Sequence, residues 1–377
     1  MCIANLTFHI NTTRYKDMAA VRTRTTLSSG TYLDERIRSN KMTRRRARVG
    51  DIVTIDLELT PENDFVPNGF LFDTNGEVTF VVGWGNYLPG LHDLVTGMRE
   101  GEQVNNVSID AGWGDRNPEL VIDVPKENFQ KLSSADAIKV GSILDLKGGI
   151  RVTVTKITED SIVVDANHPL AGSSYSCTMT VKEIHSLPQT KMTFDSKAGR
   201  SSSERLSESR YEVATWALGC FWSGELAFMR TPGVVGTKVG YTQGNTIDPT
   251  YEDVSQGTTK HREAIMVVYD PTVVSYRDLV GVYLERLAAT TSQYYKTDPF
   301  AEEHNESDQY RNGIYYHNAE QRDIAQEMVI LPNNNFYQVE LKKAASFYDA
   351  EEYHQKYLLK GGQSARKGSK ETIRCFG

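Results

Sequence analysis

Cysteine is scarce in this chain of 377 residues, whose four cysteines are Cys2, Cys177, Cys220 and Cys375. So few thiols argue against a disulfide-stabilised scaffold, and no pair has the spacing of a metal-binding motif. We therefore expect no bound metal. The distribution favours a reducing compartment in which one or two of these thiols are reactive.

Long apolar runs are missing as well, since no stretch approaches the roughly 20 residues that a membrane-spanning helix needs. The net charge of -7 argues against extensive nucleic-acid binding. With 39% hydrophobic and 24% charged residues, the composition is typical of a globular protein in water. We expect neither membrane nor nucleic acid among its partners.

Acidic residues are few in the first 48 positions, which hold eleven Lys or Arg against three Asp or Glu. Such a basic leader, over residues 1–47, is typical of an organelle transit peptide, and a disordered tail has the same composition. Both interpretations stay open. The protein is accordingly expected in the cytoplasm or in an organelle, either a plastid or a mitochondrion.

Residues 187–209 lack regular periodicity and contain six serines, including the run Ser201-Ser202-Ser203. This composition predicts a flexible linker. It separates a first domain at residues 48–186 from a second at residues 210–377. No internal repeat relates the two, so the length predicts a fusion of unlike domains.

The first domain is rich in strand signals. Apolar and polar residues alternate over Ile52–Leu59, which is typical of a half-buried strand. Short strands and glycine-rich turns follow, and one short helix is predicted over Leu91–Met98. We expect a mainly antiparallel β domain.

Several motifs of this domain resemble FK506-binding-protein-type prolyl isomerases. They are Phe72-Asp73, Asn86-Tyr87-Leu88-Pro89-Gly90-Leu91, Gly97-Met98, Trp113-Gly114 and Val164 through Gly172. The run Asp165–Gly172 is similar to the end of the inserted flap in the SlyD-like subgroup. The resemblance implies an FKBP-like barrel with a chaperone flap over about 117–165 that binds unfolded clients.

The same resemblance implies an apolar cup that surrounds a proline ring and lowers the barrier to rotation of its amide bond. Seven residues, which we call the cup, would line it: Phe72, Asp73, Tyr87, Leu88, Leu91, Trp113 and Leu170. Each is also a plausible core residue of a barrel. The family usually carries aromatic residues at Leu57 and near Cys177, and tyrosine at Trp113, so client binding is the firmer expectation and isomerase activity the weaker.

Cys220 stands at a predicted strand-to-helix junction of the second domain. Tyr211–Trp216 has strand composition, Gly219 interrupts it, and Phe221–Arg230 carries apolar residues at helical spacing. A thiol in the first helical turn faces unpaired amides and the positive end of the helix dipole, which stabilise the thiolate. Taken alone, the pattern favours a buried cysteine beside core aromatics over a reactive thiol.

Strands and helices alternate through the rest of this domain. Helices are predicted at 275–287, 319–328 and 350–358, and a strand at 309–315. We expect an α/β domain, built as a two-layer α+β sandwich with a ferredoxin-like core.

Together, five motifs resemble peptide methionine sulfoxide reductase A, in its plant-type form. They are Gly219-Cys220-Phe221-Trp222, Gly240-Tyr241, His261-Arg262-Glu263, Gln309-Tyr310-Arg311 and Glu352-Tyr353-His354-Gln355. The resemblance implies that Cys220 attacks the sulfoxide sulfur and that a neutral Glu263 supplies the proton. The hydroxyl groups of Tyr241 and Tyr310 would hold the sulfoxide oxygen.

Phe221 and Trp222 would then cradle the S-methyl group and select the S epimer. Cys375 follows a glycine-containing segment that we expect to be mobile, and it would resolve the sulfenic acid on Cys220 as a disulfide. The resemblance implies thioredoxin as the external reductant, with no bound cofactor. We expect a monomer that acts on oxidised or unfolded protein clients.

Two positions depart from the family pattern. Ser223 replaces a glycine, and Asn305 replaces an aspartate that forms a hydrogen bond in the substrate site. An amide still donates and accepts hydrogen bonds, so we expect an altered rate or pH profile. The alternative is a chaperone or peptide-binding protein whose reductase domain is inactive or weakened.

Overall fold

The computed structural model describes most of the two predicted domains. The described residues are 45–62, 72–129, 138–145, 151–188, 210–297, 308–330 and 337–374. The predictions for the leader, for most of the linker, for Asn305 and for Cys375 lie outside these residues. No helix in the described ranges is both long enough and apolar enough to cross a bilayer.

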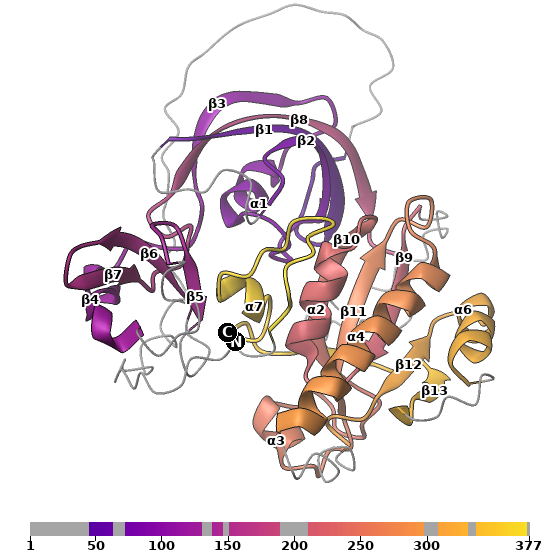
Figure 1. Cartoon of the computed structure of the whole chain (residues 1–377). Helices are drawn as coiled ribbons and strands as arrows, with labels where there is room; N and C mark the ends of the chain where they lie inside the picture. The colour runs from indigo at the N-terminus through magenta and orange to yellow at the C-terminus, as the bar shows by residue number, and fades with distance from the viewer. Residues whose placement is uncertain are drawn as a thin grey trace, which may run out of the picture.

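An antiparallel sheet with strand order β2-β1-β8-β3 forms the main part of the N-terminal domain. Its strands are β1 (Asp51–Pro61), β2 (Asn75–Val81), β3 (Gln103–Asp110) and β8 (Ser174–Ser186). The sheet curves around helix α1 (Pro89–Val95), which lies on its concave side (Figure 1). The predicted alternation holds in β1, because Val53, Ile55 and Leu57 are buried while Asp56 and Glu58 are exposed.

A second antiparallel sheet, with strand order β4-β7-β6-β5, is inserted in the chain between β3 and β8. Its strands are β4 (Val121–Pro125), β5 (Ile143–Asp145), β6 (Arg151–Ile157) and β7 (Ser161–Asp165), with short 3-10 helices at Pro118–Leu120 and Lys126–Phe129. It has a small hydrophobic core of its own around Val124, Phe129 and Val154. Figure 1 shows it as a separate lobe beside the curved sheet.

The C-terminal domain is built on a six-stranded sheet of order β13-β12-β9-β11-β10-β14. The strands are β9 (Glu212–Ala217), β10 (Val234–Thr242), β11 (Arg262–Tyr269), β12 (Gly313–Tyr316), β13 (Glu340–Lys343) and β14 (Phe347–Asp349). β12 and β13 pair in parallel, and the other printed pairings are antiparallel. All eight residues of β11 are buried, as expected for a central strand.

Helices α2 and α4 lie against this sheet (Figure 1). The helices are α2 (Phe221–Arg230), α3 (Tyr251–Ser255), α4 (Tyr276–Thr297), α6 (Ala319–Ala325), the π-helix η5 (Gln326–Ile330) and α7 (Tyr357–Lys360). α2 has the predicted bounds. Ser275 and Asn318 cap α4 and α6, since each side-chain oxygen accepts a hydrogen bond from the amide three residues later. The chain is therefore multidomain, with a strand-rich N-terminal part and an α/β C-terminal part.

Two predicted elements are wrong in extent. The helix expected at 350–358 is replaced by turns, and α7 begins at Tyr357, because Lys356 adopts a left-handed backbone with φ of 55°. The strand expected at 309–315 begins at Gly313. Gln309 instead lies in a turn, because its carbonyl oxygen accepts a hydrogen bond from the amide of Glu263. In both places tertiary contacts override the local pattern.

The C-terminal segment also differs from the mobile tail that its glycines predict. Residues 362–365 are buried, and the described chain continues to Arg374 in contact with the N-terminal domain. The two domains share one hydrophobic cluster, which includes Leu226 and Met229 of α2 together with Leu88 and Leu91 of the N-terminal domain. The predicted fusion of two domains is thus a packed arrangement in the structure.

Candidate active site

Cys220 is the N-cap of α2, directly after Gly219, whose φ of 73° suits glycine. The cysteine is half-buried and forms no disulfide bond with another described residue. Its position in front of the first turn of a ten-residue helix brings the thiol to the positive end of the helix dipole. This favours the thiolate, which is the nucleophilic form of cysteine.

Glu263 lies beside this helix start. Its side chain is 2% exposed, and its carboxylate oxygens accept from the amide of Phe221 at 3.2 Å and from the side-chain nitrogen of Gln309 at 2.8 Å. Burial raises the pKa of Glu263 to about 7, and the two hydrogen bonds only partly oppose that rise. The carboxyl group is therefore partly protonated near neutral pH. A proton donor requires a pKa raised in this way.

The antiparallel pairing of β10 with β11 places Tyr241 opposite Glu263. The Tyr241 side chain is fully buried, and its hydroxyl donates to Glu351 at 2.8 Å. The second oxygen of Glu351 accepts from the amide of Tyr251 at 2.8 Å. Burial and these carboxylates raise the pKa of Tyr241, so its hydroxyl keeps its proton.

Tyr310 belongs to the same site. Burial raises the pKa of its phenol, and the nearby charges of Glu263, Tyr251 and Cys220 raise it further. Tyr310 also shares a side-chain hydrogen bond with Tyr251. The structure thus brings the predicted nucleophile, the predicted proton donor and both predicted tyrosines into one electrostatic environment.

Aromatic rings contact one another at the start of α2, directly after Cys220, and include both of the predicted substrate-binding aromatics. Phe221 is buried, with its ring centroid 6.2 Å from that of Tyr241 and 5.2 Å from that of His354. Trp222 stacks on Tyr357 at 3.8 Å and donates from its indole nitrogen to Nδ1 of His354 at 3.2 Å. The rings form an apolar wall of the kind that an S-methyl group fits.

Sequence reasoning missed five members of this site. They are Tyr251, Gln309, Glu351, His354 and Tyr357. Gln309 and His354 stood inside motifs that carried the family resemblance, and that position was the available signal for them. Burial lowers the pKa of His354 to about 4, so the imidazole is neutral and accepts the Trp222 hydrogen bond.

Two predicted site residues, Asn305 and Cys375, lie outside the described residues, so their roles stay predictions. Ser223 is 1% exposed, and its hydroxyl has no hydrogen-bond partner within the described part of the chain. In the same part there is no cluster of three His, Cys, Asp or Glu side chains that suits a metal ion.

The apolar members of the cup lie together in the N-terminal domain. Phe72, Tyr87, Leu88, Leu91 and Leu170 are all buried members of one hydrophobic core, and Trp113 packs against it. The Phe72 and Tyr87 rings are 5.0 Å apart. The seventh member, Asp73, has a partly exposed carboxylate that pairs with Arg366.

Trp113 stacks on His168 with ring centroids 3.9 Å apart. Its indole nitrogen and the hydroxyl of Tyr87 are buried and have no hydrogen-bond partner in the described ranges. A buried donor without a partner costs free energy. A peptide carbonyl oxygen could therefore accept a hydrogen bond from either group.

Two protein families match this chain in separate regions. Residues 212–373 match the family model described as peptide methionine sulfoxide reductase. Residues 43–126 match the model described as FKBP-type peptidyl-prolyl cis-trans isomerase. The two resemblances inferred from motifs are therefore confirmed on one chain.

Individual relatives match the C-terminal region. A peptide methionine sulfoxide reductase of Solanum lycopersicum is 44% identical over 175 residues, covering 44% of this chain and 86% of the relative. The chloroplastic peptide methionine sulfoxide reductase A4 of Oryza sativa subsp. japonica is 45% identical over 174 residues, covering 44% of this chain and 64% of the relative. Among solved structures, methionine sulfoxide reductase A of Corynebacterium diphtheriae matches with 33% identity and a TM-score of 0.34, over 40% of this chain and 74% of that chain.

Proposed function

The chain belongs to the peptide methionine sulfoxide reductase family, and from this premise we propose that its C-terminal domain reduces methionine-S-sulfoxide in proteins, in peptides and as the free amino acid. One observation carries the proposal. Cys220 is the N-cap residue of α2, and the buried carboxyl group of Glu263 accepts a hydrogen bond from the amide of Phe221, the next residue. The nucleophile and the proton donor are therefore both attached to the Cys220–Phe221 peptide unit, Cys220 by its covalent bond and Glu263 by its hydrogen bond.

The first part of the cycle removes the sulfoxide oxygen. The Cys220 thiolate attacks the sulfoxide sulfur while Glu263 protonates the oxygen; an S–S bond forms, the S–O bond breaks, and the oxygen leaves as water after a second protonation from solvent. Water then attacks the Cys220 sulfur and the S–S bond breaks with release of a proton, so methionine leaves reduced by two electrons and Cys220 is left as a sulfenic acid, oxidised by two electrons. The dry environment of Glu263 supports this role because it raises the pKa to about 7, so that the carboxyl group is partly protonated at neutral pH.

Tyr241 and Tyr310 would orient the sulfoxide oxygen, which accepts hydrogen bonds and donates none. The Tyr241 hydroxyl already donates to Glu351, so it must turn toward the substrate or leave that task to Tyr310. Phe221 and Trp222 would receive the S-methyl group against their rings. A fixed oxygen and a fixed methyl pocket together select one epimer at sulfur.

Recycling requires a second thiol. Cys375 would attack the sulfenic acid, releasing water and forming the Cys220–Cys375 disulfide, which the dithiol of thioredoxin then reduces by exchange. No bound cofactor is needed for these steps.

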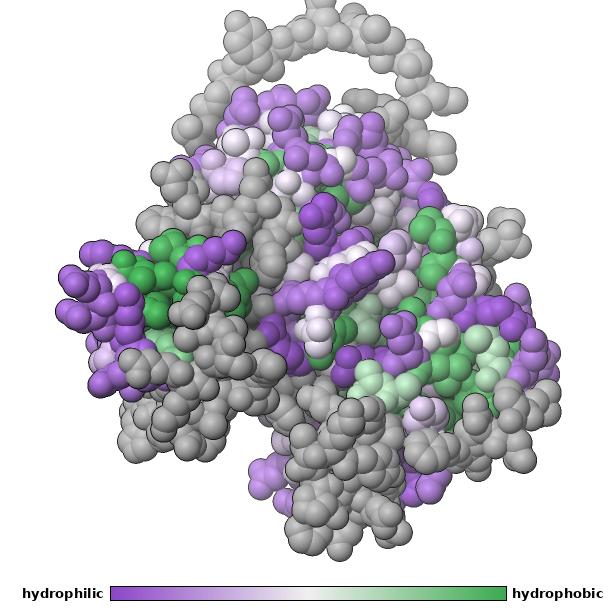
Figure 2. Space-filling model, viewed as in Figure 1, coloured by the Kyte–Doolittle hydropathy of each residue, from purple (hydrophilic) through white to green (hydrophobic). Residues whose placement is uncertain are grey.

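The N-terminal domain is of a prolyl isomerase family, and we propose that it binds prolyl segments of unfolded or oxidised clients and isomerises some of them. Its inserted sheet would act as a chaperone flap. Figure 2 shows hydrophobic side chains gathered on this lobe, and Val121, Val140 and Ile143 are among its exposed apolar residues. Holding a client near Cys220 would raise the local concentration of its methionine sulfoxides.

Three further attributions are proposals of the same kind. The C-terminal domain would have a ferredoxin-like core, and the protein would act as a monomer. The basic leader, together with the chloroplastic relative, supports an organelle as its location, with the cytoplasm as the alternative.

A second candidate function is a client-binding chaperone with a weakened reductase. The buried hydroxyl of Ser223, three residues after the N-cap Cys220, has no hydrogen-bond partner among the described residues, and it favours this alternative because it leaves an unsatisfied group beside the site. Asn305, in place of the family's aspartate, points the same way.

A single-turnover experiment tests the proposed chemistry. Reduced protein is mixed with a methionine-S-sulfoxide peptide without thioredoxin. We expect one equivalent of peptide to be reduced and the Cys220–Cys375 disulfide to form, as peptide mapping would detect. Cys375→Ser should retain the single turnover, accumulate a sulfenic acid that reacts with dimedone, and stall with thioredoxin. Sustained turnover by Cys375→Ser would contradict the role of Cys375, and absence of any turnover would favour the chaperone.

A further inference from the structure

Residues 357–374, which we call the arm, are the last described part of the reductase domain and pack against the N-terminal domain. Leu358 and Leu359, each 1% exposed, and Ala365 belong to the same hydrophobic core as the apolar residues of the cup. Figure 1 shows α7 and the arm lying between α1 of the N-terminal domain and α2 of the reductase domain. The arm thus occupies the space between the two domains.

Two polar contacts fasten the arm to the cup region. Nε2 of His168 lies 3.2 Å from the carbonyl oxygen of Leu359 and donates to it, since a carbonyl oxygen only accepts. Nδ1 of the same ring accepts from the amide of Leu170, a cup residue. Farther along the arm, the guanidinium of Arg366 donates to Asp73 of the cup at 3.1 Å.

The His168 contact is stable over a wide pH range. Burial lowers the pKa of His168 to about 4, and the ring stacks on Trp113 of the cup. The neutral ring has one donor and one acceptor, and the two contacts above use both. His168 therefore links two cup residues to the backbone of the arm.

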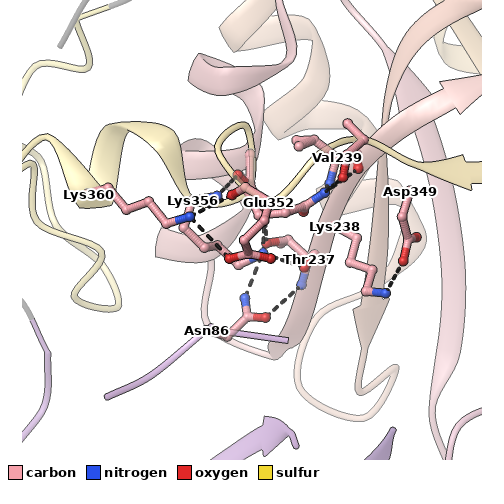
Figure 3. Close-up of polar contacts among 11 residues, drawn as sticks. Asn86, Thr237, Lys238, Val239, Asp349, Glu352, Lys356 and Lys360 are labelled. Atoms are coloured by element: carbon pink, nitrogen blue, oxygen red, sulfur yellow. Dashed lines mark hydrogen bonds and ion pairs between the residues drawn. The ribbon is translucent and has the colours of Figure 1, made fainter. Parts of the chain in front are cut away.

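A buried network fixes the point where the arm begins (Figure 3). The ammonium of Lys356 bonds to Glu225 of α2 and to the carbonyl oxygen of Thr237, each at 2.7 Å. The Thr237 hydroxyl donates to Glu225 at 3.1 Å, and the side chain of Asn86 exchanges two hydrogen bonds with Thr237. Since Asn86 precedes the cup residue Tyr87 in the chain, the network sets the arm directly beside the cup.

The arm packs in the same hydrophobic core as the apolar cup residues and leaves two polar atoms of the cup without partners. With the arm in place, the Tyr87 hydroxyl and the Trp113 indole nitrogen lack partners among the described residues. The arm contains no proline, so it presents no prolyl bond to isomerise. A prolyl peptide would offer carbonyl oxygens to the buried donors, which an arm of this geometry does not.

We propose that the cup is the docking site of the arm, and that the arm and a prolyl peptide exclude each other from it. This rests on the proposed function, in which the cup binds prolyl segments. The peptide then binds only those molecules from which the arm has detached. The apparent affinity equals the affinity of the open cup multiplied by the fraction of such molecules. The full chain therefore binds prolyl peptides more weakly than a chain whose arm is detached.

Peptide binding measured on full-length protein tests the competition. The probe is a fluorescein-labelled Ala-Leu-Pro-Phe peptide, followed by fluorescence anisotropy. Leu359→Asp places a charge in the apolar core and should tighten binding by about tenfold or more. Arg366→Glu sets two acidic groups against each other and should tighten binding about threefold. Lys370→Glu, an equal charge reversal at an exposed arm residue, should leave affinity unchanged.

Equal affinity of wild type and both arm variants would overturn the exclusion. Arg366 has a side chain 57% exposed, so its variant keeps the test valid if Leu359→Asp does not fold. Peptide binding by none of the proteins would instead overturn the proposed prolyl site.

Hydrogen exchange without peptide separates these two failures. If the arm covers the cup, amides in residues 84–90 and 166–172 should exchange about tenfold faster in Arg366→Glu or Leu359→Asp than in wild type or Lys370→Glu. Faster exchange supports docking even where no peptide binds. Unchanged exchange in both arm variants would overturn the docking itself.

Discussion

Glu263 shows how single residues of this site depend on their surroundings. A carboxyl group in water is ionised at neutral pH, whereas burial brings the pKa of Glu263 to about 7. Its two acceptor bonds, to the Phe221 amide and to Gln309, hold it against the start of α2. The residue is therefore both positioned and partly protonated under ordinary conditions.

The pH profile of Glu263→Gln tests this role. The reduction rate of the wild type should fall as pH rises through about 7, because the proton donor is lost. Glu263→Gln should lower the rate by about 10²–10⁴-fold and should remove this part of the pH dependence. Reduction rates measured from pH 5 to 9 with an S-sulfoxide peptide give the answer. A variant that keeps the wild-type rate and profile would contradict the role.

The stability of the folded state should also depend on pH, because the pKa of Glu263 is higher in the folded state than in the unfolded state. The resulting contribution to stability is complete below about pH 4.5 and is lost as pH rises through about 7. Between pH 5 and pH 9, the free energy of unfolding should shift in favour of Glu263→Gln by about 3 kcal/mol relative to wild type. Urea unfolding at both pH values measures it, and a pH-independent difference would speak against the buried acid.

The roles of single residues could be predicted where a reactive side chain stands in a recognisable motif. Cys220, Glu263, Tyr241 and Tyr310 carry reactive groups in recognisable motifs, and the structure places them together. Glu351 carries no such motif, and its role depends on a hydrogen bond from Tyr241, 110 positions earlier. Contacts of that kind cannot be inferred from local sequence.

At the level of elements, local pattern predicted the central pieces well. α2 begins and ends where its apolar spacing indicated, and β1 shows the burial alternation expected over Ile52–Leu59. The helix predicted at 350–358 was wrong, because Lys356 and its neighbours turn their side chains inward to meet α2 and β10. A buried ion pair decided the backbone there, and helix propensity did not.

Lys356→Met tests the weight of that ion pair. It leaves the Glu225 carboxylate buried at 1% exposure without its cation, which should lower the free energy of unfolding by about 3–5 kcal/mol. Lys238→Met is a matched control, since the Lys238 ammonium pairs with Asp349 at the surface and should matter by about 1 kcal/mol or less. Denaturant titrations compare the two. Similar small losses would show that the pair does not fix the arm.

At the scale of the whole molecule, the shared core is the feature that sequence did not indicate. The Ser-rich linker and the glycines near the C-terminus predicted domains joined loosely. Instead, Leu226, Leu358 and Leu359 of the reductase domain pack in the same cluster as Leu88 of the other domain. Domain packing depends on surfaces that meet only after folding, so no local periodicity reports it.

This shared core predicts joint unfolding. Separation of the domains would expose apolar side chains that are now 0–3% exposed, at about 25 cal/mol for each Å². We expect calorimetry of the full chain in reducing buffer to show one transition for both domains. Arg366→Glu weakens the contact between the arm and Asp73, so its calorimetric transition should broaden or separate into two. Two well-separated transitions in the wild type would contradict a shared core.

The central claim is that Cys220 reduces methionine-S-sulfoxide with electrons from thioredoxin. The most direct measurement is thioredoxin-coupled turnover of two peptides that differ only in the configuration of the sulfoxide. Wild type should reduce the S epimer and not the R epimer, and Cys220→Ser should be inactive. Cys177→Ala should retain activity, because the Cys177 thiol is buried in the other domain and its pKa is raised to about 11. No reduction by wild type, or continued reduction by Cys220→Ser, would contradict the account.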